Sequence, residues 1–147
     1  WYFDGSDVGL TTSGEKIEAL DALADGRLLI SAGGAAAVPK TGGGTLKWQD
    51  EDVATFTFTT QGVNTAGNWA VYFDGTIVTG LAAEDVSGFW TDETTGDHYL
   101  NIVGAFNLGG VSGNGKSIVK LLAGNNAAAL VPWTTPPFNV DGMELGQ

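Results

Sequence analysis

One stretch of this chain fits the pattern of a phosphate-binding loop. Residues 110–117 read Gly-Val-Ser-Gly-Asn-Gly-Lys-Ser, and in a working loop of this kind backbone amides surround the phosphates while the lysine, here Lys116, reaches the terminal one. Only residues 118–147 follow, which is too short for the parallel sheet and the second, Mg²⁺-holding acid that such enzymes need. Three prolines also interrupt that segment: Pro132, Pro136 and Pro137. We therefore expect a glycine-rich turn that binds no nucleotide.

Clusters of acidic side chains are the second feature to weigh, because calcium is bound by oxygen ligands. The candidate clusters are Asp4 with Asp7, Asp50-Glu51-Asp52, and Asp92-Glu93 with Asp97. Calcium requires roughly six to eight oxygens, and none of these clusters has the spacing of a known calcium loop. We expect solvated turns between strands, with Asp50 and Asp52 as the best ligands if calcium binds. No other cofactor is expected.

Residues for covalent or acid–base catalysis are scarce. His98 is the only histidine and the chain has no cysteine, so a catalytic triad and a zinc site are both disfavoured. Two of the 17 acidic residues could converge for glycoside hydrolysis, but no second signal supports that chemistry. We predict that the protein is not an enzyme and that His98 is an ordinary strand residue.

The five tryptophans raise the possibility of sugar binding, because aromatic faces stack on carbohydrate rings. Trp1 and Trp69 recur at one position of an internal repeat, which indicates core packing. Trp48 and Trp133 lie in loop-like sequence and are the better candidates for a carbohydrate ligand. A lectin-like binding module therefore remains an alternative function.

Composition limits the partners and the location of the protein. Its 17 acidic and 6 basic residues give a formal charge of −11, which disfavours nucleic acid and anionic membrane surfaces. No apolar run approaches the roughly 18 residues of a membrane span. The chain begins at Trp1 on strand-like sequence, and its acidic, cysteine-free, glycine-rich composition suits a secreted, cell-surface protein from which a signal peptide has been removed.

An internal repeat organises the elements that must position these residues. Tyr2-Phe3-Asp4-Gly5 returns as Tyr72-Phe73-Asp74-Gly75, with Trp1 and Trp69 just upstream. The later landmarks recur in the same order: a charged pair that begins with Glu before Ile17 or Val86, a turn before Leu28 or His98, a glycine-rich turn at 41–44 or 110–115, and an apolar strand at 53–58 or 118–122. We divide the chain into repeat one (1–68), repeat two (69–124) and an extended tail (125–147), all within a single domain.

Most of the repeated pieces predict β-strands. Residues 55–59 alternate Thr and Phe with a period of two, and residues 28–30 and 100–103 are short apolar runs bounded by turn residues. Residues 15–24 are ambiguous, because Thr12 to Glu15 resembles a helical capping box and helix formers follow. Their counterpart, residues 86–91, contains a central glycine and β-formers. We therefore predict strands in both copies, with a short helix as the alternative.

These landmarks resemble tandem modules of long secreted bacterial surface proteins. Such modules centre on a phrase like Tyr-Phe-Asp-Gly-Ser-Asp-Val-Gly-Leu, which stands here at residues 2–10, followed by a hairpin like residues 25–31 and an acidic stretch like residues 50–52. Copy two departs from the phrase at Thr76-Ile77 and has Gly115-Lys116-Ser117 instead of the acidic triplet. The resemblance covers residues 1–124 and implies β-structure, export to the cell surface and no known activity.

Two architectures fit two such repeats of about seventy residues. The first is an all-β antiparallel sandwich or barrel made by both copies. The alternative is a pair of four-stranded propeller-like blades, which would require an oligomer to close a ring. We favour the sandwich.

The ends of the repeat suggest a function. We expect copy two to end after Leu122 without the aromatic strand that closes copy one, while Trp1-Tyr2-Phe3-Asp4-Gly5 is a spare strand of that type. An open sheet edge invites another strand, and insertion into the next molecule would build a homopolymer. We predict a non-enzymatic structural subunit of an extracellular filament or surface layer. The predicted interface residues are Trp1, Tyr2, Phe3, Asp4, Gly5, Trp133 and Phe138.

Overall fold

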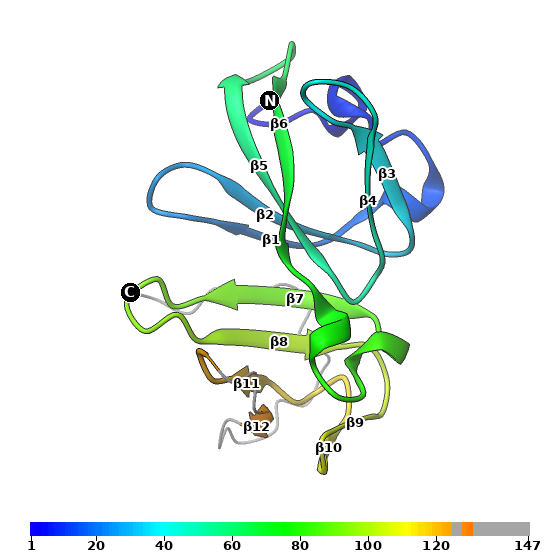
Figure 1. Ribbon diagram of the computed structural model, residues 1–147, viewed down its shortest axis with the longest axis vertical. Helices are drawn as coiled ribbons and strands as arrows, with labels where there is room; N and C mark the ends of the chain where they lie inside the picture. The colour runs from blue at the N-terminus through cyan, green and yellow to red at the C-terminus, as the bar shows by residue number, and fades with distance from the viewer. Residues whose placement is uncertain (125–127, 131–147) are drawn as a thin grey trace.

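The computed structural model describes residues 1–124 and 128–130, and this part of the chain is all-β (Figure 1). It contains twelve strands in antiparallel sheets and four 3-10 turns, each of three or four residues. Within these residues the sheets form two similar halves joined as a two-repeat β-sandwich, and neither half closes into a barrel. The prediction of an antiparallel sandwich is thus confirmed.

Copy one denotes the chain up to Phe73, the last residue of its last strand, and copy two denotes the chain that follows. Copy one contains a four-stranded sheet and a hairpin. The sheet has the order β1-β2-β5-β6, formed by β1 (Ile17–Ala22), β2 (Leu28–Ala32), β5 (Val53–Thr60) and β6 (Ala66–Phe73). The hairpin consists of β3 (Ala36–Pro39) and β4 (Thr45–Trp48).

Copy two repeats this plan. Its sheet has the order β7-β8-β11-β12, formed by β7 (Val86–Thr91), β8 (His98–Ile102), β11 (Val119–Leu121) and β12 (Ala128–Leu130). Its hairpin consists of β9 (Phe106–Leu108) and β10 (Val111–Gly113).

The register of the strands makes the two copies equivalent residue by residue. Leu20 pairs with Ile30 as Phe89 pairs with Leu100. Both pairs of strands even carry the same one-residue irregularity, after Ile17 in β1 and after Val86 in β7. These pairings define the counterparts used below.

Each copy opens with the same aspartate-capped turn. Asp4 caps the 3-10 turn η1 (Gly5–Val8) and Asp74 caps η3 (Gly75–Ile77), each carboxylate accepting a hydrogen bond at 3.0 Å from the backbone amide two residues on. A second short turn follows in both copies, η2 (Ser13–Glu15) and η4 (Leu81–Ala83). The Tyr-Phe-Asp-Gly phrase is therefore the start of a turn that leads each copy into its sheet.

Residues 17–22 form a strand, as predicted, rather than the alternative helix. The helical signal is satisfied by the single turn η2 before β1. There the buried Glu15 carboxylate accepts hydrogen bonds from the backbone amides of Thr11, Thr12 and Ala37, at 2.8, 2.7 and 3.1 Å. Burial raises the pKa of Glu15, but these hydrogen bonds outweigh it and the pKa lies below its usual range. Glu15 thus fixes β3 to the chain that enters β1.

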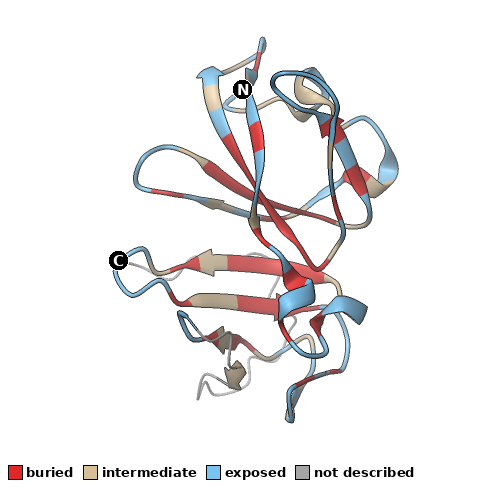
Figure 2. Cartoon of the chain, in the orientation of Figure 1, coloured by how far each residue is buried: buried red, intermediate tan, exposed pale blue. Residues whose placement is uncertain are grey.

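Buried residues follow the strands of both sheets (Figure 2). Those of the copy-one sheet belong to two hydrophobic clusters, one on each face of the sheet. The inner face carries Ile30 and Phe56, which the β3–β4 hairpin covers with Val38 and Trp48. Side chains of the outer face, Leu29 among them, belong to the second cluster, which also contains the inner face of the copy-two sheet. The outer face of copy one therefore packs against the inner face of copy two.

Candidate functional site

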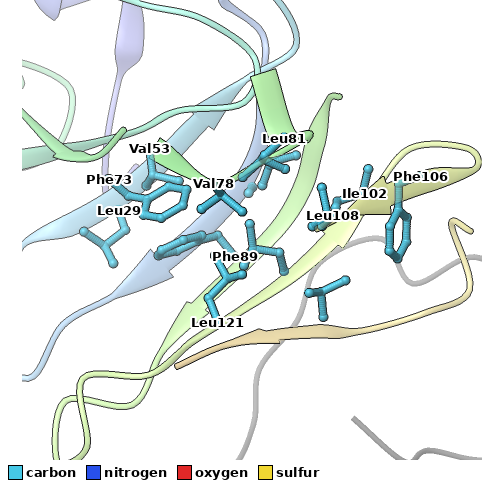
Figure 3. Packing of buried hydrophobic residues seen from close by; sticks show 14 of the residues in the cluster. Leu29, Val53, Phe73, Val78, Leu81, Phe89, Ile102, Phe106, Leu108 and Leu121 are labelled. Atoms are coloured by element: carbon cyan, nitrogen blue, oxygen red, sulfur yellow. The ribbon is translucent and has the colours of Figure 1, made fainter. Parts of the chain in front are cut away.

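The contact between the copies, called the joint below, has an apolar centre (Figure 3). Leu29 and Val53 project from the copy-one sheet toward Phe89 and Leu121 of copy two, and Phe73 ends β6 beside them. Each of these side chains is at most 4% exposed. Burying a side chain of this size is worth about 1.5–3 kcal/mol, so the joint is part of the core rather than a loose contact between domains.

The acidic triplet predicted as a calcium site forms the polar part of the joint. Asp52 Oδ1 accepts a hydrogen bond from the backbone amide of Gly75 at 2.8 Å, while its Oδ2 accepts one from Gln49 at 2.9 Å. The Asp50 carbonyl accepts a hydrogen bond from Val86 at 3.0 Å. The turn that precedes β5 therefore holds the first turn and the first strand of copy two.

Both oxygens of Asp52 are engaged by backbone amides, and Asp50 acts here through its carbonyl. Within residues 1–124 and 128–130, no group of three or more acidic or histidine side chains could hold a metal ion. The calcium assignment to Asp50 and Asp52 therefore gains no support, and the structure gives the triplet a connecting role instead.

The joint also gathers carboxylates in a poorly solvated place. Burial raises the pKa of Asp85 to about 6, and the nearby negative charges of Glu18 and Asp50 add to the effect. Burial likewise raises the pKa of Glu51. Lys16 offsets part of this charge through an ion pair with Glu18 at 2.5 Å. No sequence pattern marks Asp85, because its environment comes from residues far away in the chain, among them Glu18 and Asp50.

Copy two contains the same turn with different side chains. The amide of Ser117 donates to the Asn114 carbonyl at 2.8 Å, as that of Asp52 donates to the Gln49 carbonyl at 3.1 Å. The Ser117 hydroxyl also accepts from the Asn114 amide, as Asp52 does from Gln49. Ser117 thus stands where copy one has Asp52.

The phosphate-loop-like stretch is built into this turn and the hairpin before it. Residues 111–113 form β10, paired antiparallel with β9, and residues 119–121 form β11. A phosphate-binding loop leads from a strand into a helix whose amino end faces the phosphates, and a strand stands in that place here.

The structure corrects the expectation that copy two lacks its last strand. β12 pairs antiparallel with β11, and Leu130, Ala129 and Ala128 face Val119, Lys120 and Leu121. This strand takes the position of β6, with Ala128 where copy one has Trp69. The expectation was wrong because β12 lacks the aromatic residues that mark β6.

Residues 1–5 lie against copy one rather than beside β11. The Tyr2 carbonyl accepts a hydrogen bond from Gly62 at 3.1 Å, and the Asp4 amide donates to the Thr65 hydroxyl at 2.8 Å. Phe3 packs on Phe56, with ring centroids 5.2 Å apart. Trp1 and Tyr2 remain 88% and 56% exposed, while predicted interface residues Trp133 and Phe138 lie outside the described residues.

In an Asp-Gly turn, Gly5 and Gly75 are expected to need a backbone conformation open only to glycine. This expectation is wrong, because neither residue is among the glycines with positive φ. Gly75 is required for another reason. A Cβ at this position would lie 2.4 Å from the carbonyl oxygen of Glu51, across the joint.

The other candidate residues lie in packed positions. His98 begins β8, its Nδ1 lies 2.5 Å from Thr91 Oγ1, and burial lowers its pKa. Trp48 is 2% exposed, and its Nε1 has no hydrogen-bond partner. A depression of about 400 Å³ beside it is lined by Ala35, Ala36, Ala37, Lys47, Trp48, Gln49 and Asp52.

No family model, curated protein or solved structure matches this chain. Within the described residues, no helix has the length and apolar character needed to span a bilayer. The joint between the copies, with its apolar centre and acidic turn, is therefore the site on which functional inference rests.

Proposed function

We propose that this protein is a non-enzymatic structural component of an extracellular filament or surface layer, in which such repeats stack end to end. The observation that carries the proposal is the joint. The outer face of one sheet is buried on the inner face of the next, equivalent sheet through Leu29 and Phe89. A contact between equivalent units uses different faces of each, so it can be repeated along an axis.

Location outside the cell is part of the proposal. Its support is the acidic, cysteine-free composition and the resemblance of the repeat to modules of secreted surface proteins. A high net charge of one sign also keeps such a protein soluble at high concentration.

The mode of assembly differs from strand insertion. Because β12 occupies the edge beside β11, assembly in this proposal proceeds through sheet faces. Trp1 and Tyr2, which are largely exposed, are then side chains available to a neighbouring molecule rather than members of its sheet.

The test is the state of the purified protein as its concentration rises. We expect the mass measured by analytical ultracentrifugation to increase with concentration, and linear particles to be visible by electron microscopy. A protein that stays at 15.1 kDa up to about millimolar concentration contradicts the proposal, since a structural subunit must bind its neighbours at least that tightly.

Carbohydrate binding is a second candidate function, and one observation favours it. The buried Nε1 of Trp48 lacks a hydrogen-bond partner next to the depression described above, and a buried donor of this kind normally finds an acceptor. Glycan-array binding that disappears in Trp48→Phe but persists in Trp90→Phe would support it. Equal signals from both variants would count against a ligand at this place.

A further inference from the structure

The strands β1 and β7 occupy the same place in their sheets but differ in what covers them. In β7, Val86 and Phe89 are 0% and 1% exposed. Their counterparts in β1, Ile17 and Leu20, are 37% and 52% exposed. Ile17 and Leu20 are thus apolar side chains that solvent reaches.

The cover over β7 comes in part from the other copy. Leu29 and Val53 of copy one share a cluster with Phe89, and the Asp50 carbonyl binds the amide of Val86. In the part of the chain that the structure describes, no further copy covers β1 in the way that copy one covers β7. Ile17 and Leu20 are therefore exposed where Val86 and Phe89 are buried. We call Gly5, Ile17 and Leu20 the β1 surface, because Gly5 corresponds to Gly75 of the joint.

Copy two presents the complementary outer face. By register, Tyr99 stands where copy one has Leu29, since Tyr99 pairs with Lys120 as Leu29 pairs with Thr55. Tyr99 is partly exposed and packs against Trp90, with ring centroids 5.2 Å apart. We call Tyr99, Lys116 and Ser117 the copy-two outer surface.

The charged residue beside the β1 surface and the one on the copy-two outer surface are of opposite sign. In the joint, Glu51 lies over Gly75, its Cγ 2.7 Å from the place of a Gly75 Cβ. The counterpart of Glu51 on the copy-two outer surface is the exposed Lys116. Beside Gly5 the chain carries the exposed Asp7, where copy two has Ile77, and Oδ2 of Asp7 accepts a hydrogen bond from the Thr65 amide at 2.8 Å. The charged residue nearest each surface is therefore a lysine on one and an aspartate on the other, and these attract each other while two lysines or two aspartates repel.

We propose that the β1 surface of one molecule binds the copy-two outer surface of a second copy of this chain, an inference that rests on the proposed structural function. Leu20 packs on Tyr99, the Gly5 amide donates to the Ser117 hydroxyl, and Lys116 lies near Asp7. The contact repeats the internal joint. Because its two surfaces differ, each bound molecule leaves one of each free, and the chain of contacts stays open.

The test uses two variants that each block one surface. Leu20→Glu places a charge on the β1 surface, and Tyr99→Glu places one on the copy-two outer surface. We expect each variant alone to remain monomeric in analytical ultracentrifugation. An equimolar mixture retains one intact surface of each kind and should give a dimer of twice 15.1 kDa, and nothing larger. Val103→Glu is the matched control, because Val103 is also 52% exposed, and it should assemble like the unmodified chain.

Circular dichroism would establish that each variant is folded. If Tyr99→Glu is not, Lys116→Glu replaces it, because Lys116 lies in an exposed turn. An unmodified chain that assembles while Leu20→Glu and Tyr99→Glu assemble equally well overturns this inference and leaves the structural function standing. A mixture of folded variants that stays monomeric also overturns it. An unmodified chain that never assembles removes the proposed function as well.

Discussion

Gly75 illustrates how one missing side chain permits the joint. The carbonyl oxygen of Glu51 lies 2.4 Å from the place of a Gly75 Cβ, which no side chain can accept without movement of the backbone. We expect Gly75→Ala to lower the free energy of unfolding by about 1–3 kcal/mol, as overpacking in a core does. Urea denaturation followed by tryptophan fluorescence would measure this loss.

Gly5→Ala is the matched control, because the two glycines are counterparts. At Gly5 a Cβ would meet the end of the Leu10 side chain at 3.0 Å, and that side chain can move. Gly5→Ala should therefore lower the free energy of unfolding by much less than Gly75→Ala does. Equal losses in the two variants would mean that the turn conformation, and not the contact across the joint, requires glycine.

The ionised side chain of Asp85 destabilises the folded protein, because the joint partly removes it from water. Burial raises its pKa from 3.8 to about 6, so between these values the unfolded chain releases the proton before the folded chain does. Stability therefore falls as the pH rises from about 4 through 6. Asp85→Asn should remove this fall and raise the free energy of unfolding at pH 7 by about 1 kcal/mol, allowing for partial exposure.

The measurement is urea denaturation between pH 4 and pH 7.5. Glu51, whose pKa burial also raises, contributes to the slope of the unmodified chain, so the difference between variant and parent isolates Asp85. Glu84→Gln, one residue earlier, serves as the control for a lost negative charge. Parallel pH profiles for Asp85→Asn and the parent would disprove the assignment.

At the scale of elements, sequence patterns predicted the strands that carry their own signal. β5 was recognisable from alternation and β2 from its apolar run, and the run Leu28-Leu29-Ile30 is apolar throughout because both faces of β2 are buried. β12 was missed because Ala128-Ala129-Leu130 has neither alternation nor aromatic residues. Its strand conformation comes from pairing with β11, and strand preference depends on such context more than on composition.

The joint itself was not predictable from the sequence. Asp50 and Asp52 stood out as acidic residues, but their partners Val86 and Gly75 are distant in the chain. A pattern of acids cannot distinguish a calcium ligand from a carboxylate that holds backbone amides, because both need oxygen atoms aimed at a positive group. Only the fold decides between them.

The turn at residues 114–117 is expected to be inert toward nucleotides. Lys116 is exposed, and the hydrogen bond of its amide to Asn114 does not depend on its side chain. Lys116→Ala should change the free energy of unfolding by no more than about 0.5 kcal/mol, and calorimetry should detect no ATP binding by either protein. ATP affinity that is lost in this variant would contradict the structural account of residues 110–117.

At the scale of the molecule, one hydrophobic cluster extends through both copies. Leu29 and Val53 of copy one belong to it together with Leu100 and Leu121 of copy two. A repeat that shares its core with a neighbour is stabilised by that interface as well as by its own packing. Neither copy is therefore expected to unfold by itself.

This continuity predicts a single cooperative transition that a change in the joint shifts as a whole. Leu29 is 1% exposed, and Leu29→Ala should lower the free energy of unfolding by about 2–5 kcal/mol, the usual cost of such a cavity. Hydrogen exchange of the backbone amides in β5 would report on copy one, and exchange of those in β8 on copy two. In Leu29→Ala the amides of both strands should lose protection from exchange together. Leu46→Ala, in the partly buried edge of the other cluster, is the control and should cost less. Two separate transitions in the unmodified chain, or loss of protection confined to β5 in Leu29→Ala, would mean that the copies are independent units and that their contact contributes little to the fold.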